Sequence, residues 1–403
     1  MARILIVADD LSGAADCAVA CAVEGIDSLV ALNEAASDAD ADVLALDANT
    51  RAMAPHEAAT ETARLVRSCA RGDGQILFKK LDSTLRGNIG VEVAAALEAW
   101  RSLAHRSSAI VVAAPAFPAT GRTTIGGRLW LDGVRLEPDL PEMLEAAGLQ
   151  TGRIGLEAVR SGRLPAFLQT NASACTAFVC DAQTEADLRS IAEAAASLQD
   201  SAIWAGSAGL ARCLPAALNL SRCADRGAVV PARDGPVLIV VGSLAGLSRS
   251  QAAVLSATND VAVITLRPRA LLAGPRAEEW RDSQDLLVRT LAGGRDVLIL
   301  LAAEERVDPG MAPRLCSAAA SLIAPCRAGI GGLILTGGET ARAVLAAFGV
   351  QFLVPFREVE PGVPFALAST DHGERLPVIT KAGAFGDPDT LVRCRGAMRN
   401  LFR

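Results

Sequence analysis

Short apolar runs alternate with alanine-rich, helix-like segments along the whole chain, and this alternation constrains the fold more than any other feature. Continuously apolar strands that are separated by helices are typical of a parallel sheet covered on both faces. The sequence therefore predicts an α/β fold. The first predicted strands are Arg3–Ala8, Asp42–Asp47, Gln75–Phe78, Ser108–Phe117, Thr176–Asp181 and Ser201–Gly209, with helices at Gly13–Glu24, Pro55–Ala70 and Ile89–Trp100.

Two such arrays follow one another. At 403 residues the chain is longer than a single hydrophobic core normally supports. The segment RGAVVPARDGP, Arg226–Pro236, interrupts the alternation with glycine, proline and charge, as interdomain linkers do. We predict two domains, 1–228 and 236–403, each with a mostly parallel sheet flanked by helices.

The overall charge and hydropathy exclude several classes of partner. A formal net charge of −6 argues against a nucleic acid or a membrane surface, which would require a basic patch. The sequence has no apolar run of about 18 residues that could span a bilayer. The start, MARILIVADD, is typical of a first strand and not of a signal peptide, so we expect a cytoplasmic protein.

Cysteine and histidine do not form a metal-binding pattern. The chain has 10 cysteines without a C-x-x-C pair, and its 3 histidines, His56, His105 and His372, are far apart. Scattered cysteines of this kind are usually small buried hydrophobic residues in a reducing compartment. The sequence identifies no metal ligands.

Polar residues follow the predicted strands of the first domain. In an open parallel sheet, ligands bind outside the carboxyl ends of the strands. Adjacent carboxylates at such a position repel one another unless a cation, a proton or a hydroxyl compensates them, although a helix cap beside a solvated aspartate is the simpler interpretation. Cations, carboxylates and hydroxyls together suit a small polyhydroxylated acid. The candidate residues are Asp9, Asp10, Ser12, Asn49, Arg51, Lys80, Asp82, Ser83, Arg86 and Arg122.

Lysine is rare in this sequence. Lys79, Lys80 and Lys381 are the only lysines, and all three lie where a predicted strand meets a polar or glycine-rich turn. A compact, flexible ammonium group often binds phosphate or carboxylate where a planar guanidinium does not fit. These positions therefore favour an anionic ligand.

The second domain has three strand–glycine–helix junctions. Glycines at the start of a helix expose backbone N–H groups, which bind phosphate. Neither G-x-x-x-x-G-K-[ST] nor G-x-G-x-x-G occurs, so the pattern indicates phosphate without a general nucleotide motif. The junctions lie at Gly242-Ser243, Thr336–Thr340 and Lys381–Gly386.

Seven segments, in order along nearly the whole chain, resemble the four-carbon acid sugar kinase family. They are ADDLSGA (8–14), DANTR (47–51), KKLDSTLRGNIG (79–90), APAFPATGRTT (115–124), GSAGLA (206–211), TGGETA (336–341) and TKAGAFGDPDTL (380–391). The resemblance implies an N-terminal domain that binds the sugar acid, a C-terminal domain that binds ATP, and a reaction in the cleft between them. It also implies Mg²⁺-dependent transfer of phosphate to the terminal hydroxyl of threonate, erythronate or 3-oxo-tetronate.

The resemblance places Asp9, Asp10, Lys80, Asp82, Ser83 and Arg86 in the acid-sugar site, and the strand-end pattern adds Ser12, Asn49, Arg51 and Arg122. Asp10, Asp82 and Lys80 are expected to be catalytic, with one of the two aspartates as the base. The other candidates of the first domain are expected to bind the sugar acid. The expected nucleotide-binding residues are Ser243, Gly337, Gly338, Glu339, Thr340, Lys381 and Gly383.

This chain departs from the usual family motifs in two places. Ser12 replaces a threonine but keeps the hydroxyl. In the last motif, commonly K-S-G-N-F-G, Ala382 and Ala384 replace two side chains that form hydrogen bonds, while the backbone donors remain.

Three other interpretations compete with the kinase family, and the second of them does not fit the sequence. Asp9, Asp10 and Asp47 also resemble the acidic site of a phosphoacceptor receiver, although the additional cations and the second domain do not fit a signalling module. A dehalogenase-type phosphatase requires an aspartate two positions after its nucleophile, and here Leu11 and Ser12 occupy those positions. A non-catalytic binding protein of the same fold is the third interpretation. The acid, its stereochemistry and the oligomeric state are left open.

Overall fold

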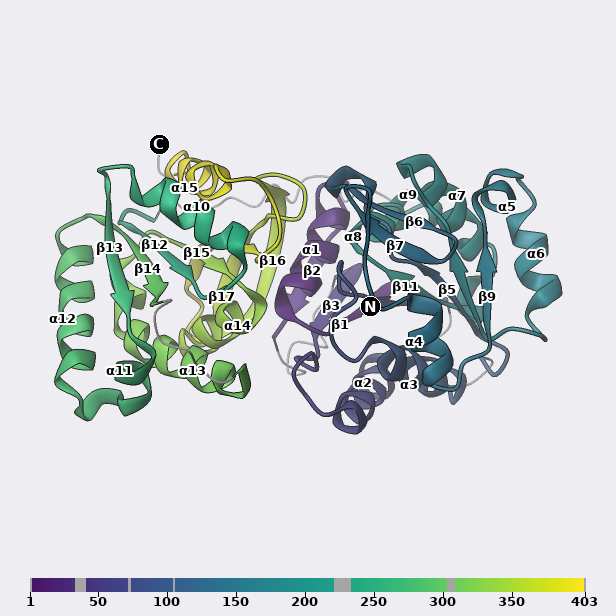
Figure 1. Cartoon of the computed structure of the whole chain (residues 1–403), viewed down its shortest axis with the longest axis horizontal. Coiled ribbons are helices and arrows are strands. Elements are labelled where there is room, and N and C mark those ends of the chain that lie inside the picture. Colours follow the sequence, from purple (N-terminus) through teal and green to yellow (C-terminus); the bar gives the residue numbers. More distant parts are fainter. Residues whose placement is uncertain are drawn as a thin grey trace. The chain divides into compact units, whose positions relative to one another are not determined.

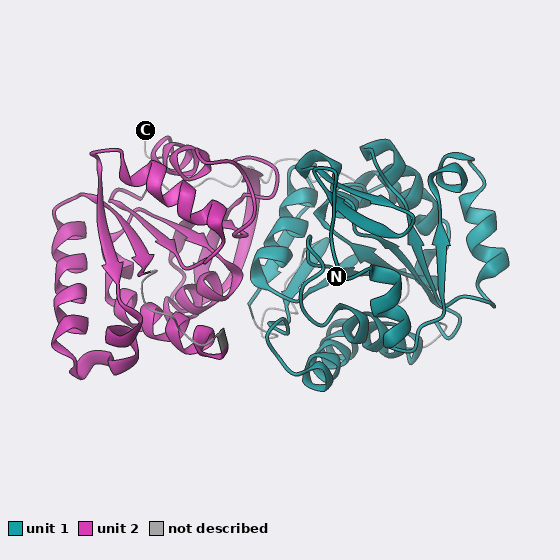
Figure 2. Cartoon of the chain, in the orientation of Figure 1, with its two compact units in different colours: residues 1–226 teal, residues 227–403 magenta. Residues whose placement is uncertain are grey.

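The computed structural model describes residues 2–32, 41–71, 74–103, 106–220, 233–302 and 309–401. The chain divides into two compact units, Met1–Arg226 (unit 1) and Gly227–Arg403 (unit 2), which are described separately (Figure 2). Residues 226–232 of the predicted linker, and His105, lie outside the described residues.

Unit 1 is built on a parallel sheet with the strand order β2-β3-β1-β4-β11-β5-β10-β9. The predicted apolar runs form its central strands, in which every residue is buried. The strands are β1 (Ile4–Ala8), β2 (Ser28–Ala31), β3 (Val43–Asp47), β4 (Ile76–Lys80), β5 (Ile110–Ala114), β9 (Thr151–Ile154), β10 (Ala177–Cys180) and β11 (Ala202–Gly206).

Helices cover the sheet of unit 1, as the alternation predicts (Figure 1). Helix α1 packs against α8, while α2 packs against α3 and α3 against α4. Helix α1 ends three residues before Gly25, whose φ of 81° closes the following turn. The helices are α1 (Leu11–Ala22), α2 (Pro55–Cys69), α3 (Ile89–Arg101), α4 (Leu140–Ala146), α5 (Leu156–Arg160), α6 (Leu164–Asn171), α7 (Glu185–Ala196), α8 (Ala208–Ala211) and α9 (Leu214–Ala217).

A small antiparallel sheet follows β5, and the sequence analysis did not predict it. It consists of β6 (Arg122–Ile125), β7 (Arg128–Leu131) and β8 (Val134–Arg135). Gly126 and Gly127 form the first turn with φ values of 64° and 77°. Their N–H groups donate to the carboxylate of Asp181, at 2.7 and 2.8 Å, which fixes this turn to the end of β10.

Unit 2 is built on a mixed sheet with the strand order β13-β14-β12-β15-β18-β17-β16. The first five strands in this order, β13, β14, β12, β15 and β18, are parallel. β17 is antiparallel to both of its neighbours, β18 and β16, which the alternation did not predict. The strands are β12 (Val237–Val241), β13 (Val261–Leu266), β14 (Asp296–Leu301), β15 (Gly332–Thr336), β16 (Val350–Glu358), β17 (Pro364–Thr370) and β18 (Arg375–Lys381), and the helices are α10 (Gly246–Ser256), α11 (Pro268–Ala273), α12 (Glu278–Ala292), α13 (Ala312–Ile323), α14 (Gly338–Ala347) and α15 (Thr390–Arg399).

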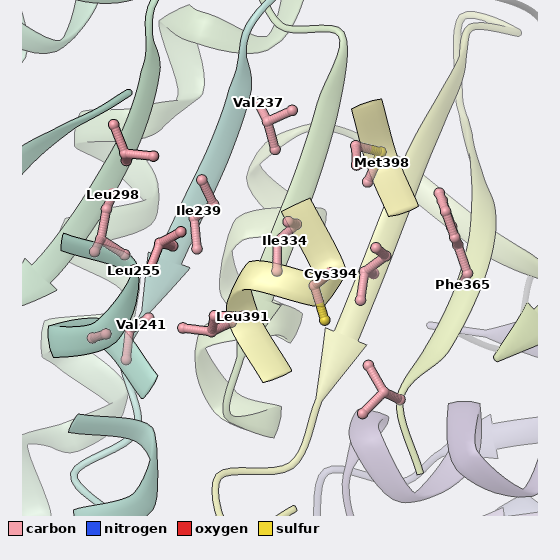
Figure 3. Packing of buried hydrophobic residues seen from close by; sticks show 14 residues of the cluster. Val237, Ile239, Val241, Leu255, Leu298, Ile334, Phe365, Leu391, Cys394 and Met398 are labelled. Atoms are coloured by element: carbon pink, nitrogen blue, oxygen red, sulfur yellow. The ribbon is translucent and has the colours of Figure 1, made fainter. Parts of the chain in front are cut away.

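One hydrophobic cluster of unit 2 lies between this sheet and two of its helices (Figure 3). Ile239 of β12 and Ile334 of β15 pack with Leu255 of α10 and with Leu391 and Met398 of α15, and all five side chains are fully buried. This packing fixes α10 and α15 on the sheet and, with them, the turns at the carboxyl ends of β12 and β18.

No helix in the described part of the chain is both long enough and apolar enough to cross a membrane.

The sheets and helices described above make the fold α/β in both units, with mostly parallel sheets flanked by helices, as predicted.

Candidate active site

The polar turns of unit 1 lie next to one another because their strands are neighbours. β1 pairs with β3 on one side and with β4 on the other, all in parallel. Asp9 and Asp10 after β1 therefore lie beside Arg51 after β3 and Asp82 after β4. The structure brings together residues that are more than seventy positions apart in the sequence.

Arg51 links three carboxylates. Its Nε donates to Asp9 at 2.7 Å, its Nη1 donates to Asp10, and its Nη2 lies 3.1 Å from Asp82 Oδ1. Burial alone would lower the pKa of Arg51, but the three carboxylates outweigh it and raise that pKa. One guanidinium thus compensates the repulsion between the three acids.

Asp82 is a hub for hydrogen bonds. Its carboxylate accepts from the backbone N–H of Thr84 at 3.0 Å, from the Thr84 hydroxyl at 2.7 Å, and from Nε and Nη2 of Arg86 at 3.0 and 2.8 Å. Burial raises the pKa of Asp82, but the bonds from Arg86 and the charges of Arg51, Arg86 and Lys80 lower it far more. The carboxylate therefore stays ionised and holds the turn together.

Asp10 has a different environment. As the N-cap of α1, it accepts from the backbone N–H of Gly13 at 2.8 Å. Burial raises the pKa of Asp10 above its usual value, and Asp9 adds to this effect, although Arg51 and Lys80 oppose it. A carboxyl group with raised proton affinity suits a general base better than one whose pKa is lowered.

The two adjacent lysines contact opposite sides of the sheet. Both lie within β4, and not after it as the sequence suggested, so their side chains alternate across the sheet. Lys79 Nζ lies 2.9 Å from Glu92 of α3, and both side chains are 1% exposed. Lys80 Nζ lies near Gly13 of α1, 3.2 Å from the position that a Cβ would take there, and donates to Leu81 O at 2.7 Å.

Lys80 is the lysine of the acidic cluster. Burial lowers its pKa, but Cys17, Asp16, Asp9 and Asp82 together raise it. Its ammonium group therefore stays charged beside the carboxylates, whereas Lys79 is occupied by the buried pair with Glu92 on the other side of the sheet.

The other candidates of unit 1 differ in exposure. Ser12 and Ser83 are buried, and in the described part of the chain Ser12 Oγ has no hydrogen-bond partner. Arg122 is 3% exposed, and its Nε donates to Ser83 O at 3.2 Å. Asn49 is exposed with a φ of 52°, and the side chain of Arg86 is 57% exposed. Arg86 and Asn49 can therefore reach a ligand from solvent.

Two residues outside the predicted site position it. Asn88 lies at the N-cap of α3, but its side chain does not cap the helix. Instead its Nδ2 donates to Thr50 O and Met53 O, both at 3.0 Å, and so fixes the turn that carries Arg51. Glu92 is the other, through its pair with Lys79. Its place in the first turn of α3 was visible in the sequence, but nothing in the pattern indicated its partner.

In unit 2 the glycine turns also converge, because β12, β15 and β18 are neighbours. A Cβ on Gly242 would stand 1.9 Å from Thr340 Oγ1, and one on Gly383 would stand 2.0 Å from Ser243 Oγ. Gly337 has a φ of 97° and precedes α14, at whose start Gly338, Glu339 and Thr340 lie. The predicted nucleotide residues are thus brought together, and the glycines are required for their close approach.

Lys381 is oriented differently from the expectation. Its Nζ is directed to backbone carbonyls of the following loop: Ala382 O at 2.9 Å, Phe385 O at 3.1 Å and Gly383 O at 3.5 Å. The side chain is buried, and burial lowers the pKa of Lys381 to about 8. The ammonium group therefore supports the loop from within.

Among the described residues, no group of three or more histidine, cysteine or acidic side chains could hold a metal ion. A cavity of about 700 Å³ in unit 2 is lined by Gly235, Arg395 and Arg399, among others. It lies at the end of β12 opposite the glycine turns, and both arginines there pair with the buried Asp296. The cavity is therefore not part of the candidate site.

Comparison with known proteins agrees with this division. Residues 4–214 match a family model described as a sugar-binding N-terminal domain, and residues 238–391 match one described as a nucleotide-binding C-terminal domain. A D-threonate kinase of Cupriavidus necator is 43% identical over 98% of this chain and 97% of its own length. The chain belongs to the four-carbon acid sugar kinase family.

Three further relatives at lower identity are also named as kinases. A D-threonate kinase of Salmonella typhimurium is 33% identical over 96% of both chains. Relatives at 28% and 29% identity are named D-erythronate kinase, from Heliobacterium modesticaldum, and 3-oxo-tetronate kinase, from Burkholderia multivorans. A solved structure described as a putative tRNA synthase from Salmonella typhimurium shares the fold, with a TM-score of 0.75 and 21% identity over 98% of this chain and 99% of its own.

Proposed function

We propose that this protein transfers the γ-phosphate of ATP to the terminal hydroxyl of a four-carbon sugar acid, with D-threonate as the first candidate. The observation that carries the proposal is the end-to-end similarity, at 43% identity, to a protein named D-threonate kinase. Each unit has turns at the carboxyl ends of its strands that favour an anion, and this fits a reaction between a sugar acid and a nucleotide.

In this proposal Asp10 is the general base. Its carboxylate accepts the proton of the attacking hydroxyl, because its pKa is raised while that of Asp82 is lowered. Asp82 instead holds Arg86, whose exposed guanidinium binds the substrate carboxylate. Lys80 lies beside Asp10 and stabilises negative charge that develops at the transferred group.

The remaining residues of unit 1 position the acid. The three nitrogens of Arg51 already contact carboxylates, so we assign it to holding the acids in place. Ser12 Oγ and Asp9 Oδ1, both buried and without a hydrogen-bond partner in the described residues, are available to substrate hydroxyls. Ser83, Asn49 and Arg122 complete the set of proposed binding residues: the resemblance implies Ser83, and the strand-end pattern favours the other two.

In unit 2, Ser243, Gly337, Gly338, Glu339, Thr340 and Gly383 are proposed to bind the nucleotide phosphates. Mg²⁺ would be held mainly by those phosphates, since the described residues form no group of three or more metal-binding side chains, and it would neutralise part of the phosphate charge. The domain assignments 1–228 for the sugar acid and 236–403 for the nucleotide, a reaction between the domains and a cytoplasmic location stay predictions.

The test is ADP release from Mg-ATP in a coupled assay with D-threonate, L-threonate, D-erythronate, L-erythronate and 3-oxo-tetronate, beside a blank without acid. We expect turnover above the blank with D-threonate or one of the other acids. Absence of turnover with every acid, although the protein is folded, would contradict the proposal and favour a non-catalytic binding protein.

A further inference from the structure

Lys381 is a buried cation whose Nζ, in the described part of unit 2, forms hydrogen bonds only to backbone carbonyls. It is 1% exposed, and its three Nζ contacts at 2.9, 3.1 and 3.5 Å are to carbonyl oxygens of the loop that follows β18. An ammonium group has three donors and no acceptor, so these carbonyls match its capacity.

Two side chains of helix α10 also donate hydrogen bonds to carbonyls of this loop. Ser248 of α10 donates to Gly383 O at 2.8 Å, and Gln251 of α10 donates to Phe385 O at 3.0 Å and to Asp387 O at 2.8 Å. Together with Lys381, these donors hold the loop carbonyls toward the interior of the unit.

The direction of the carbonyls determines the direction of the N–H groups. In a trans peptide the C=O of one residue and the N–H of the next point in opposite directions. The carbonyls of residues 382, 383 and 385 face donors, so the N–H groups of Gly383, Ala384 and Gly386 face the other way. Within the described residues, none of these three N–H groups donates a hydrogen bond.

We infer that Lys381 is a positioning residue that acts as an internal cation and holds the loop 382–386 in its anion-binding form, without touching the nucleotide. This inference rests on the proposed function, in which the loop binds nucleotide phosphates. It changes the role expected from the sequence, where Lys381 was placed among the residues that contact the nucleotide. It also explains how the loop binds an anion with Ala382 and Ala384 in place of polar side chains, since the donors are backbone groups.

The surroundings of Lys381 support this role. Burial lowers its pKa to about 8, and the titratable groups that oppose the shift are Cys394 of α15 and Glu360, which follows β16. Glu360 also accepts from Thr390 and Arg393, so its charge is shared. In the described part of the chain no carboxylate forms an ion pair with Lys381, which leaves the carbonyl dipoles as its compensating groups.

The test is equilibrium binding of Mg-ATP to the full chain with Lys381→Ala, with and without n-propylammonium, which replaces the missing part of the side chain. We expect the affinity to fall by at least about tenfold, as for loss of hydrogen bonds to a charged group, and to be partly restored by n-propylammonium. Tetramethylammonium, a cation without N–H donors, should not restore it. The matched control is Arg289→Ala, which removes an exposed cation of α12 in the same unit and should leave Mg-ATP affinity unchanged.

Each outcome decides one statement. If the wild-type protein binds no nucleotide, the proposed function fails. If it does, then unchanged affinity in Lys381→Ala, loss without rescue, or equal rescue by tetramethylammonium overturns the inference. Where Lys381→Ala does not fold, Lys381→Met retains most of the apolar stem: loss of Mg-ATP affinity with native circular dichroism supports the inference, and unchanged affinity overturns it.

Discussion

Asp10 and Asp82 share one arginine, yet their environments move their pKa values in opposite directions. Asp82 accepts hydrogen bonds from Thr84 and Arg86, and these bonds stabilise its ionised form. Asp10 accepts the backbone N–H of Gly13, which lowers its pKa, but burial outweighs this bond and favours the protonated form. Two carboxylates with separated proton affinities can take different roles at one site.

The first prediction concerns these two aspartates. Asp10→Asn should lower kcat by on the order of 10² to 10⁴, because a general base is lost. Asp82→Asn should mainly raise KM for the sugar acid, because Arg86 loses the acceptor that holds it. Steady-state kinetics of both variants measure this, with the exposed Asp260→Asn as a control of unchanged kinetics. Near-wild-type kcat in Asp10→Asn would show that the base is assigned wrongly.

The second prediction concerns pH. The pKa of Asp10 lies above the usual aspartate value of 3.8, so kcat/KM should decline as the pH falls through that raised pKa and the carboxylate takes up a proton. Arg51 opposes the shift, and Arg51→Gln should therefore move the acid limb to higher pH. The substrate carboxyl also titrates at low pH, but its pKa in free solution does not depend on the variant. An acid limb at the same pH in both proteins would speak against Asp10 as its source.

At the scale of the elements, strand β4 connects the two sides of the unit 1 sheet. Its last two side chains contact different helices, Lys79 the helix α3 and Lys80 the start of α1. Lys79 Nζ also donates to Lys80 O at 3.0 Å, so the buried pair with Glu92 supports the strand end that carries Lys80. The order of the sheet thus connects a structural ion pair to the candidate site.

The third prediction is that Lys79→Met or Glu92→Gln alone lowers the free energy of unfolding by about 3 to 5 kcal/mol, because each leaves a buried charge without its partner. The double variant Lys79→Met/Glu92→Gln should lose less than the sum of the two. Urea unfolding of the four proteins gives this double-mutant cycle. Additive losses would mean that the two side chains do not interact.

The fourth prediction concerns the loop after β18. Gly383→Ala should lower Mg-ATP affinity, because the added Cβ would stand 2.0 Å from Ser243 Oγ and the two turns would have to separate. Gly246→Ala is a matched control, since a Cβ at this first residue of α10 meets nothing within 4 Å. Equal Mg-ATP affinities of the two variants, measured by calorimetry, would refute the close approach.

At the scale of the molecule, the period of the apolar runs was sufficient to predict two α/β units. It did not predict β6–β8 or the antiparallel β16 and β17. The former are short and interrupted by Gly126 and Gly127. β16 and β17 follow one another without a helix between them, so the alternation of strand and helix does not indicate this pair. The alternation signal is therefore strongest for buried parallel strands that helices separate, and weak for strands joined by turns.

The site could be predicted only in part for a related reason. The rule that strand ends carry ligands placed the aspartates, Lys80 and the glycine turns at the carboxyl ends of their strands. The partner of each side chain depends on which strands are neighbours and on side-chain geometry. Hence the sequence could not show that Arg51 is held by three carboxylates, that Lys79 pairs with Glu92 or that Lys381 faces its own loop.

The central claim is that the chain phosphorylates the terminal hydroxyl of a four-carbon sugar acid, and the product of the reaction tests it most directly. We would incubate the protein with Mg-ATP and the acid that gives the fastest ADP release, and record the proton-coupled ³¹P spectrum of the product. Phosphorylation of the terminal hydroxyl predicts a new phosphomonoester signal that is split into a triplet by the two protons of the terminal CH₂ group. A doublet, from phosphate on a secondary carbon, or the appearance of inorganic phosphate alone would contradict it.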